Sequence, residues 1–116
     1  MDHLVGKPER SVALYQAFVG LIAACGDYTV SPSKTSITFK GARRGFAGAR
    51  PDNKGLVGYL DLQRAVTDRR ITSVSPYTKR LFVHHYRIRE LAELDDDFAA
   101  WVREAYAVGQ GAHLAT

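Results

Sequence analysis

Two stretches of the chain repeat hydrophobic residues at the spacing of an α-helix. The first runs from Pro8 to Cys25 and places Leu14, Phe18 and Ile22 on one helical face. The second follows Asp95, a residue type that favours the N-cap position, and continues to Gly109. The pattern therefore predicts one amphipathic helix near each end of the chain.

Between these helices the hydrophobic period changes from about 3.6 to 2, which is typical of half-buried strands. The sequence predicts strands at 27–31, 35–40, 46–51, 56–62 and 81–88, with a short extended piece at 71–74. Segment 62–66 is expected to be a loop or a short helical turn, 75–80 a turn and 90–94 a connector or helical turn. Short connections containing glycine and proline predict an antiparallel meander across 35–62.

The order of these elements predicts an α+β fold. We expect an antiparallel sheet of four to six strands flanked by the N-terminal and C-terminal helices, with the other sheet face left open. The 116 residues suggest a single domain, 1–116, with its ordered core at about 8–109. The predicted core consists of Leu14, Phe18, Leu21, Ile22, Ile37, Phe39, Phe46, Leu60, Phe82, Phe98, Trp101, Val102 and Tyr106.

Charge is distributed unevenly along the chain, which has a formal net charge of +4. Thirteen lysines and arginines face three acids between Lys34 and Arg89, whereas the remainder holds three basic residues and nine acids. Acidic helices packed against a basic sheet would explain this pattern, and so would a surface that binds anions. The sequence leaves both interpretations open.

Cysteine content and hydropathy bear on the compartment. Cys25 is the single cysteine, so no internal disulfide can form, which fits a reducing environment. The sequence shows no secretory signal, and its apolar runs are too short to span a bilayer. We expect a cytoplasmic protein that does not associate with membranes.

The stretch SPYTKRLFVHHYRI at 75–88 contains two adjacent histidines. Neighbouring residues of a strand point to opposite faces, so His84 and His85 cannot bind one metal ion together, and we expect neither a metal nor a cofactor. His84 shares the face of Phe82 and Tyr86. It is either a hydrogen-bonded histidine at the core margin or a residue that titrates beside a basic cleft. If one of the two histidines is functional, we expect it to be His84.

The function predicted first is a non-enzymatic module that binds an anionic partner, either nucleic acid or a phosphorylated small molecule. No complete catalytic set of residues is recognisable, so an enzyme is not favoured. The candidate anion-binding residues are Arg43, Arg44, Arg50, Tyr77, Lys79, Arg80 and His84. Two alternatives stay open: a small enzyme or small-molecule sensor with a pocket near His84, and a protein-interaction adaptor, including a homodimer formed through an exposed strand edge.

Three stretches carry a resemblance to a known family: ITFKGARRGFAGARPDNKGLVGYLDL, SPYTKRLFVHHYRI and LDDDFAAWVREAY. Together they make residues 12–106 resemble the family catalogued as domain of unknown function 5655. That family occurs as small bacterial proteins and as a terminal module of larger ones, and it has no established activity. The resemblance therefore implies the fold and a cytoplasmic setting, and it implies no reaction.

Overall fold

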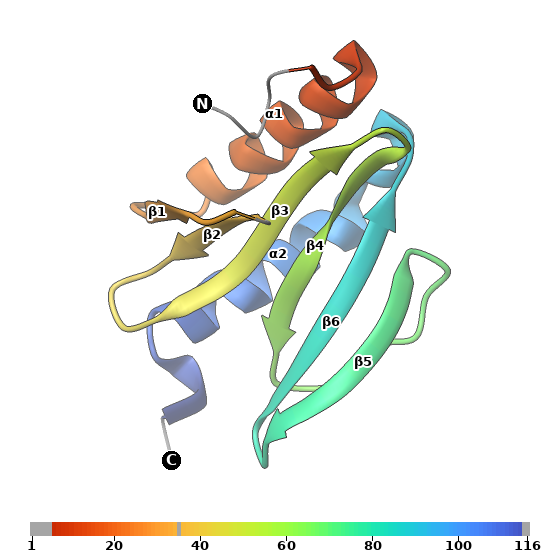
Figure 1. Cartoon of the computed structure of the whole chain (residues 1–116). Coiled ribbons are helices and arrows are strands. Elements are labelled where there is room, and N and C mark those ends of the chain that lie inside the picture. The colour runs from red at the N-terminus through yellow and green to blue at the C-terminus, as the bar shows by residue number, and fades with distance from the viewer. Residues whose placement is uncertain (1–5, 35, 115–116) are drawn as a thin grey trace.

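The computed structural model describes residues 6–34 and 36–114 (Figure 1). Within these residues one α-helix precedes the strands and a second α-helix follows them. One short 3-10 helix follows the last strand, and another follows the second α-helix. In chain order the elements are α1 Glu9–Ala23, β1 Thr29–Pro32, β2 Ile37–Lys40, β3 Gly45–Asp52, β4 Gly55–Leu62, β5 Ile71–Thr78, β6 Leu81–Ile88, η1 Leu91–Glu93, α2 Asp96–Gly109 and η2 Ala112–Leu114.

Within the described residues, the strands form one antiparallel sheet of six, in the order β1-β2-β3-β4-β6-β5. The run from β2 to β4 is the predicted meander. Strand β6 then pairs with β4, and β5 lies outside β6 at the edge of the sheet (Figure 1). The predicted α+β fold, an antiparallel sheet flanked by an N-terminal and a C-terminal helix, is confirmed.

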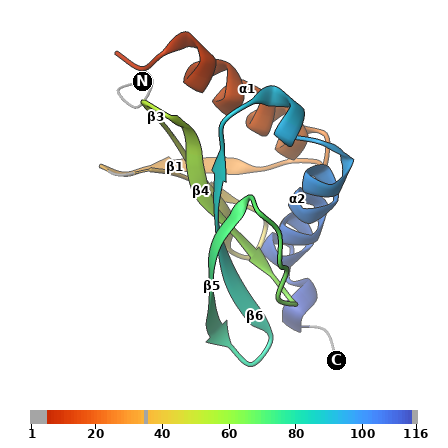
Figure 2. The same cartoon turned by 90° about the vertical axis from the view of Figure 1, so that its right-hand side faces the viewer.

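Both α-helices pack on the same face of the sheet, against β3 and β4 (Figure 2). An aromatic cluster forms the centre of this core, where the ring of Phe18 lies 5.6 Å from Tyr86 and 6.2 Å from Phe98 between centroids. Ten of the thirteen predicted core residues are buried. The other three, Leu21, Phe82 and Tyr106, are partly buried.

A glycine on β4 lets a tyrosine of β6 cross that strand. Tyr86 of β6 passes over Gly58 of β4, and its hydroxyl donates a 2.9 Å hydrogen bond to the carbonyl of Gly48 on β3. A Cβ atom at Gly58 would lie 2.5 Å from this hydroxyl and 1.9 Å from the Gly48 carbonyl oxygen. Any larger residue at Gly58 would therefore force the backbones of β3 and β4 apart.

An arginine that the sequence analysis did not single out ties the segment before β5 to α2. Arg70 is only 5% exposed, and its guanidinium lies 2.8 Å from carboxylate oxygens of both Asp68 and Asp95. It also lies 4.8 Å from the ring centroid of Trp101. Asp95 is the N-cap of α2, as predicted: its carboxylate accepts a 3.0 Å hydrogen bond from the amide of Phe98. One buried cation therefore fixes both the connecting segment and the start of α2.

The main departure from the sequence prediction concerns residues 75–78. They continue β5, whereas a turn was expected, and the turn itself is confined to Lys79 and Arg80. Proline lacks an amide donor, but β5 pairs only with β6, so Pro76 is accommodated on an edge strand. Residues 63–66 form an irregular loop without a helical turn.

Ordered structure continues past residue 109, where the sequence predicted the ordered core to end. Residues Ala112–Leu114 form a 3-10 helix, and residues 115–116 lie outside the described part. No helix within 6–34 and 36–114 is long and apolar enough to cross a membrane.

Candidate functional site on the open face of the sheet

The face of the sheet that the helices leave uncovered carries cross-strand rows of polar side chains. In one row Arg50 of β3, Val57 of β4 and Arg87 of β6 are register neighbours. The next row contains Thr38, Gly48, Tyr59, His85 and Ser73, contributed by five successive strands. Side chains that face the same way on paired strands lie close together, so both rows contribute to one surface.

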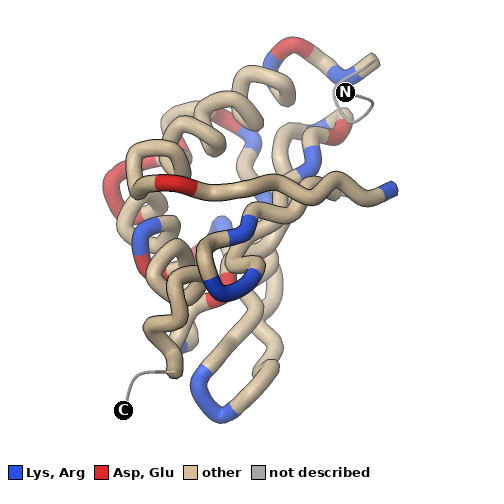
Figure 3. Tube along the Cα trace, turned by 90° about the vertical axis from the view of Figure 1, so that its left-hand side faces the viewer, with Lys and Arg blue, Asp and Glu red and all other residues tan. Residues whose placement is uncertain are grey.

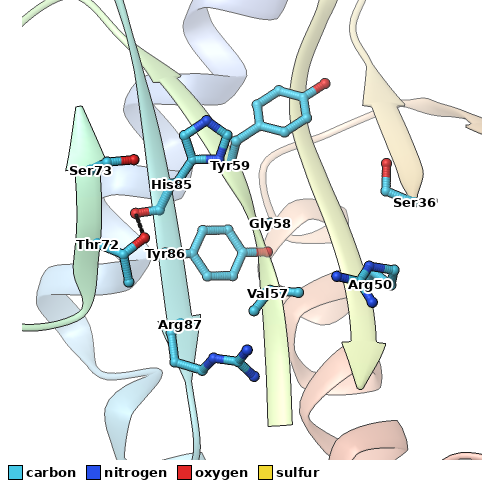
Figure 4. Close-up of a pocket in the computed structure, with 10 residues that line it drawn as sticks. All are labelled: Ser36, Arg50, Val57, Gly58, Tyr59, Thr72, Ser73, His85, Tyr86 and Arg87. Carbon is cyan, nitrogen blue, oxygen red and sulfur yellow. Dashed lines mark hydrogen bonds between the residues drawn. The ribbon is translucent and has the colours of Figure 1, made fainter. Parts of the chain in front are cut away.

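This surface is hollowed into an open-face pocket of about 600 Å³ (Figure 4). Arg50 and Arg87 lie on either side of Val57, and His85 and Tyr59 lie side by side next to them. The lining residues are Ser36, Arg50, Val57, Gly58, Tyr59, Thr72, Ser73, His85, Tyr86 and Arg87. The pocket is thus lined mainly by polar and cationic groups, with a tyrosine ring at its border.

The two arginines of the open-face pocket differ in their charge balance. Arg87 lies 2.7 Å from the carboxylate of Asp52, and this hydrogen bond lowers the pKa of Asp52. Among the described residues, no carboxylate forms an ion pair with Arg50. The positive charge available to an anion in this pocket therefore belongs chiefly to Arg50.

Tyr59 gives the pocket an aromatic surface because a glycine lies beside it. A Cβ atom at Gly48 would come within 2.3 Å of the Tyr59 ring. The ring therefore lies against bare backbone on β3, where it is half-buried. Burial raises the pKa of Tyr59 above its usual value.

Further along the same face, Asp61 and Arg44 form a partly buried ion pair. Asp61 is 3% exposed, and one of its oxygens lies 2.8 Å from the Arg44 guanidinium. The other oxygen, Oδ1, is buried without a hydrogen-bond partner among the described residues. Burial raises the pKa of Asp61 to about 6, although Arg44 acts in the opposite direction. Arg44 in turn lies 5.6 Å from the ring centroid of Tyr77, which is 65% exposed.

The β5–β6 turn lies next to this ion pair and adds more cations. A hairpin pocket of about 440 Å³ is lined there by Arg44, Thr78, Lys79, Arg80, Leu81, His113 and Leu114. The guanidinium of Arg80 donates a 3.1 Å hydrogen bond to the carbonyl of His113. Figure 3 shows basic residues in both the β2–β3 and the β5–β6 turns at this end of the molecule.

His84 lies on the opposite, covered face and is fully buried. Its Nε2 accepts a 2.9 Å hydrogen bond from the amide of Val66, and its Nδ1 lies 2.9 Å from the carbonyl of Phe82. These contacts fix the tautomer, with the proton on Nδ1. Burial lowers the pKa of His84 and favours the neutral ring. This geometry supports the structural interpretation of His84, whereas the exposed His85 borders the open-face pocket.

A family model described as a domain of unknown function, DUF5655, matches residues 1–109. The chain belongs to the DUF5655 family. No curated protein and no solved structure matches the chain at a significant level. The family resemblance seen in the sequence is therefore confirmed.

In this DUF5655 domain, four of the seven candidate residues from the sequence gather around the hairpin pocket, at the end of the sheet that carries the β5–β6 turn: Arg44, Tyr77, Lys79 and Arg80. Arg50 lies on the same face but in the open-face pocket. The exposed Arg43 lies beside Gly111, and its amide donates to the carbonyl of Gly109. His84 lies on the covered face, so the sheet separates it from Arg50 in the open-face pocket.

Sequence reasoning missed four residues of this face: Tyr59, Asp61, His85 and Arg87. The signal was present in the alternation of LVGYLDL and LFVHHYRI, where Leu56, Leu60 and Tyr86 point inward, whereas the four missed residues point outward. Metal binding has no comparable support. Across residues 6–34 and 36–114, no three His, Cys, Asp or Glu side chains form a group that could hold a metal ion.

Proposed function

We propose that this DUF5655 domain is a non-enzymatic module that binds single-stranded nucleic acid across the open face of its sheet. The observation that carries this proposal is a surface of cations and tyrosines, which we call the basic strip. It consists of Arg44, Arg50, Tyr59, Tyr77, Lys79, Arg80, His85 and Arg87.

The length of the basic strip favours an extended polyanion. The strip follows β6 from Arg87 to the β5–β6 turn, and eight residues of strand span about 26 Å. Its cations are spread along this length, as successive phosphate groups of a strand are. A compact phosphorylated metabolite would contact only one end of the strip.

The tyrosines favour a single strand over a duplex. Unpaired bases stack on aromatic side chains whatever their sequence, at about 1–3 kcal/mol per base. Tyr77 is exposed and Tyr59 is half-buried, so both rings can be reached from solvent. Duplex DNA is commonly read by a helix in the major groove, and here both α-helices pack on the other face.

Binding is favoured over catalysis because His84 and Asp61, the two groups in this part of the sheet best suited to acid–base chemistry, already have structural partners. His84 is buried and both its nitrogens are engaged. Asp61 is held by Arg44. Neither group is placed for proton exchange with a ligand on the open face, because His84 lies on the covered face and the second carboxylate oxygen of Asp61 is buried.

Fluorescence anisotropy with a labelled 12-nucleotide single strand tests the proposal over a series of salt concentrations. Arg50→Gln removes a cation that has no ion pair among the described residues, so it should weaken binding and flatten the log–log salt dependence by about 0.7. Arg103→Gln is the matched control, because this substitution removes the same charge from an exposed position on α2. Tyr77→Ala should weaken binding by about tenfold through lost stacking.

An equal loss of affinity in Arg50→Gln and Arg103→Gln would show that only the net charge of the protein matters. That result would contradict a site on the open face. Absence of binding even at low ionic strength would eliminate nucleic acid as the partner. Tight binding of a mononucleotide in the open-face pocket, with no gain for longer strands, would instead support the small-molecule alternative.

A further inference from the structure

A third pocket lies where the start of α1, the β3–β4 turn and the end of β6 meet. Figure 1 shows these three segments side by side, at the end of the sheet opposite the β5–β6 turn. This turn pocket has a volume of about 730 Å³ and is lined by Arg10, Asn53, Lys54, Arg69, Arg89, Glu90, Ala92 and Glu93. Its four cations come from four separate parts of the chain.

The two glutamates of the turn pocket are already engaged. Glu93 lies 2.8 Å from Arg69, and its other oxygen accepts hydrogen bonds from the amides of Arg89 and Glu90 at 2.7 and 3.1 Å. Glu90 is the N-cap residue of η1, and its backbone carbonyl accepts a 3.0 Å hydrogen bond from the amide of Glu93. Among the described residues, Arg10, Lys54 and Arg89 have no ion pair with a carboxylate. The lining therefore keeps an excess of two positive charges.

The backbone that carries these cations is firmly anchored. Ser11 of α1 donates a 2.6 Å hydrogen bond to the carbonyl of Asp52, and the carboxylate of Asp52 accepts one from the amide of Lys54 at 2.9 Å. Gly55 has a φ of 142°, and a Cβ atom there would meet the carbonyl oxygen of Ile88. Arg10, Lys54 and Arg89 are thus attached to segments whose relative positions are fixed before any ligand arrives.

The concentration of cations distinguishes the turn pocket from the basic strip. A phosphate monoester carries a charge of about −1.5 to −2 at neutral pH, whereas an internal phosphodiester carries one negative charge. Three unpaired cations around one pocket match the monoester, because charge-assisted hydrogen bonds from several donors can reach the same phosphate. The cations of the basic strip are spaced along a β-strand, and this spacing matches the single charges of successive phosphodiesters.

The turn pocket also adjoins the basic strip. Arg87 belongs to the strip, and its ion-pair partner Asp52 opens the turn that carries Asn53 and Lys54. We propose that the turn pocket binds the terminal phosphate monoester of a nucleic-acid strand that lies on the open face. This inference rests on the proposed function, and it adds that the domain recognises the end of a strand.

The test compares three 12-nucleotide strands of one sequence, carrying a 5′ phosphate, a 3′ phosphate or hydroxyls at both ends. One of the phosphorylated strands should bind about tenfold more tightly than the hydroxyl strand at low salt, because of the added charge-assisted contacts. Arg89→Gln and Lys54→Gln should each reduce this preference to about twofold or less and leave the affinity for the hydroxyl strand unchanged. Arg103→Gln should preserve the preference. The side chains of Lys54 and Arg89 are exposed, so their substitution should leave the fold intact.

Equal affinity for all three strands would overturn the terminal-phosphate site and leave the proposed function standing. Failure of every strand to bind would overturn both. A preference for a terminal phosphate that survives both substitutions would place the monoester elsewhere and overturn the assignment to the turn pocket.

Discussion

Replacement of His84 by alanine separates stability from function more clearly than any other single substitution. The imidazole is fully buried, and its Nε2 is the acceptor for the amide of Val66. His84→Ala leaves that amide buried without a partner, at a cost of about 1–3 kcal/mol. The lost ring also leaves a cavity, which adds about 1–2 kcal/mol.

The expected loss is therefore about 3 kcal/mol in the free energy of unfolding. In a domain of this size, 1 kcal/mol corresponds to about 4 °C, so the melting temperature should fall by about 12 °C. His84→Gln, whose amide oxygen can accept the Val66 hydrogen bond, should lose about half as much. His85→Ala should change stability by less than about 0.5 kcal/mol, because that ring is exposed.

Denaturant unfolding of the three variants at pH 7.5 and pH 5 measures these differences. The pKa of His84 is lowered from 6.5 in the folded state, so the unfolded state binds protons more readily. The stabilising contribution of the neutral ring is complete above pH 6.5 and is lost as the pH falls. The gap between wild type and His84→Ala should therefore be narrower at pH 5.

Two results would refute this reasoning. If His84→Ala melts within about 3 °C of the wild type, the Val66 contact carries little stability. If the variant is folded at the assay temperature and has nevertheless lost affinity for the nucleic acid, His84 serves ligand binding as the sequence predicted. In that case His85→Ala should leave affinity intact, whereas the structure leads us to expect that it weakens binding.

Other predictions concern charge pairs and glycines. Asp61 has a raised pKa of about 6, so the folded state binds a proton more readily than the unfolded state, and the wild type gains stability as the pH falls from 7.5 to 4.5. The melting temperature of Asp61→Asn, measured relative to the wild type, should therefore fall as the pH falls over that range. Arg70→Met should cost about 2–3 kcal/mol in urea unfolding, because it strands two carboxylates and one carbonyl that the guanidinium now contacts. Gly58→Ala should prevent folding, as judged by circular dichroism, because the new Cβ meets backbone; Gly48→Ala should stay folded but displace the Tyr59 ring and weaken strand binding in the anisotropy assay.

The fold was predictable because it depends on local periodicity. The helical spacing of Leu14, Phe18 and Ile22 and the alternation of Ile37 and Phe39 act over a few residues, and these side chains are buried as expected. The extent of β5 was not predictable in the same way. Pro76 normally disfavours a strand, and only its position at the sheet edge makes it acceptable there.

The candidate site was only partly predictable because it depends on register between distant strands. Arg44 of the β2–β3 turn contacts Asp61 of β4 and Tyr77 of β5, and no spacing in the sequence encodes those contacts. Alternation correctly placed His84 and His85 on opposite faces. It could not show which of those faces the helices cover most completely, and that difference separates a structural histidine from an accessible one.

An NMR titration of ¹⁵N-labelled protein with the 12-nucleotide strand can locate a nucleic-acid interface on the open face. We expect amide shifts to change on the outward-facing positions of β3, β4 and β6, at Tyr59, His85 and Arg87, and in the β5–β6 turn. Residues on the outer surfaces of α1 and α2, such as Arg103, should not shift. Perturbations confined to the helices, or no perturbation at a strand concentration that saturates binding, would contradict a nucleic-acid interface on the open face.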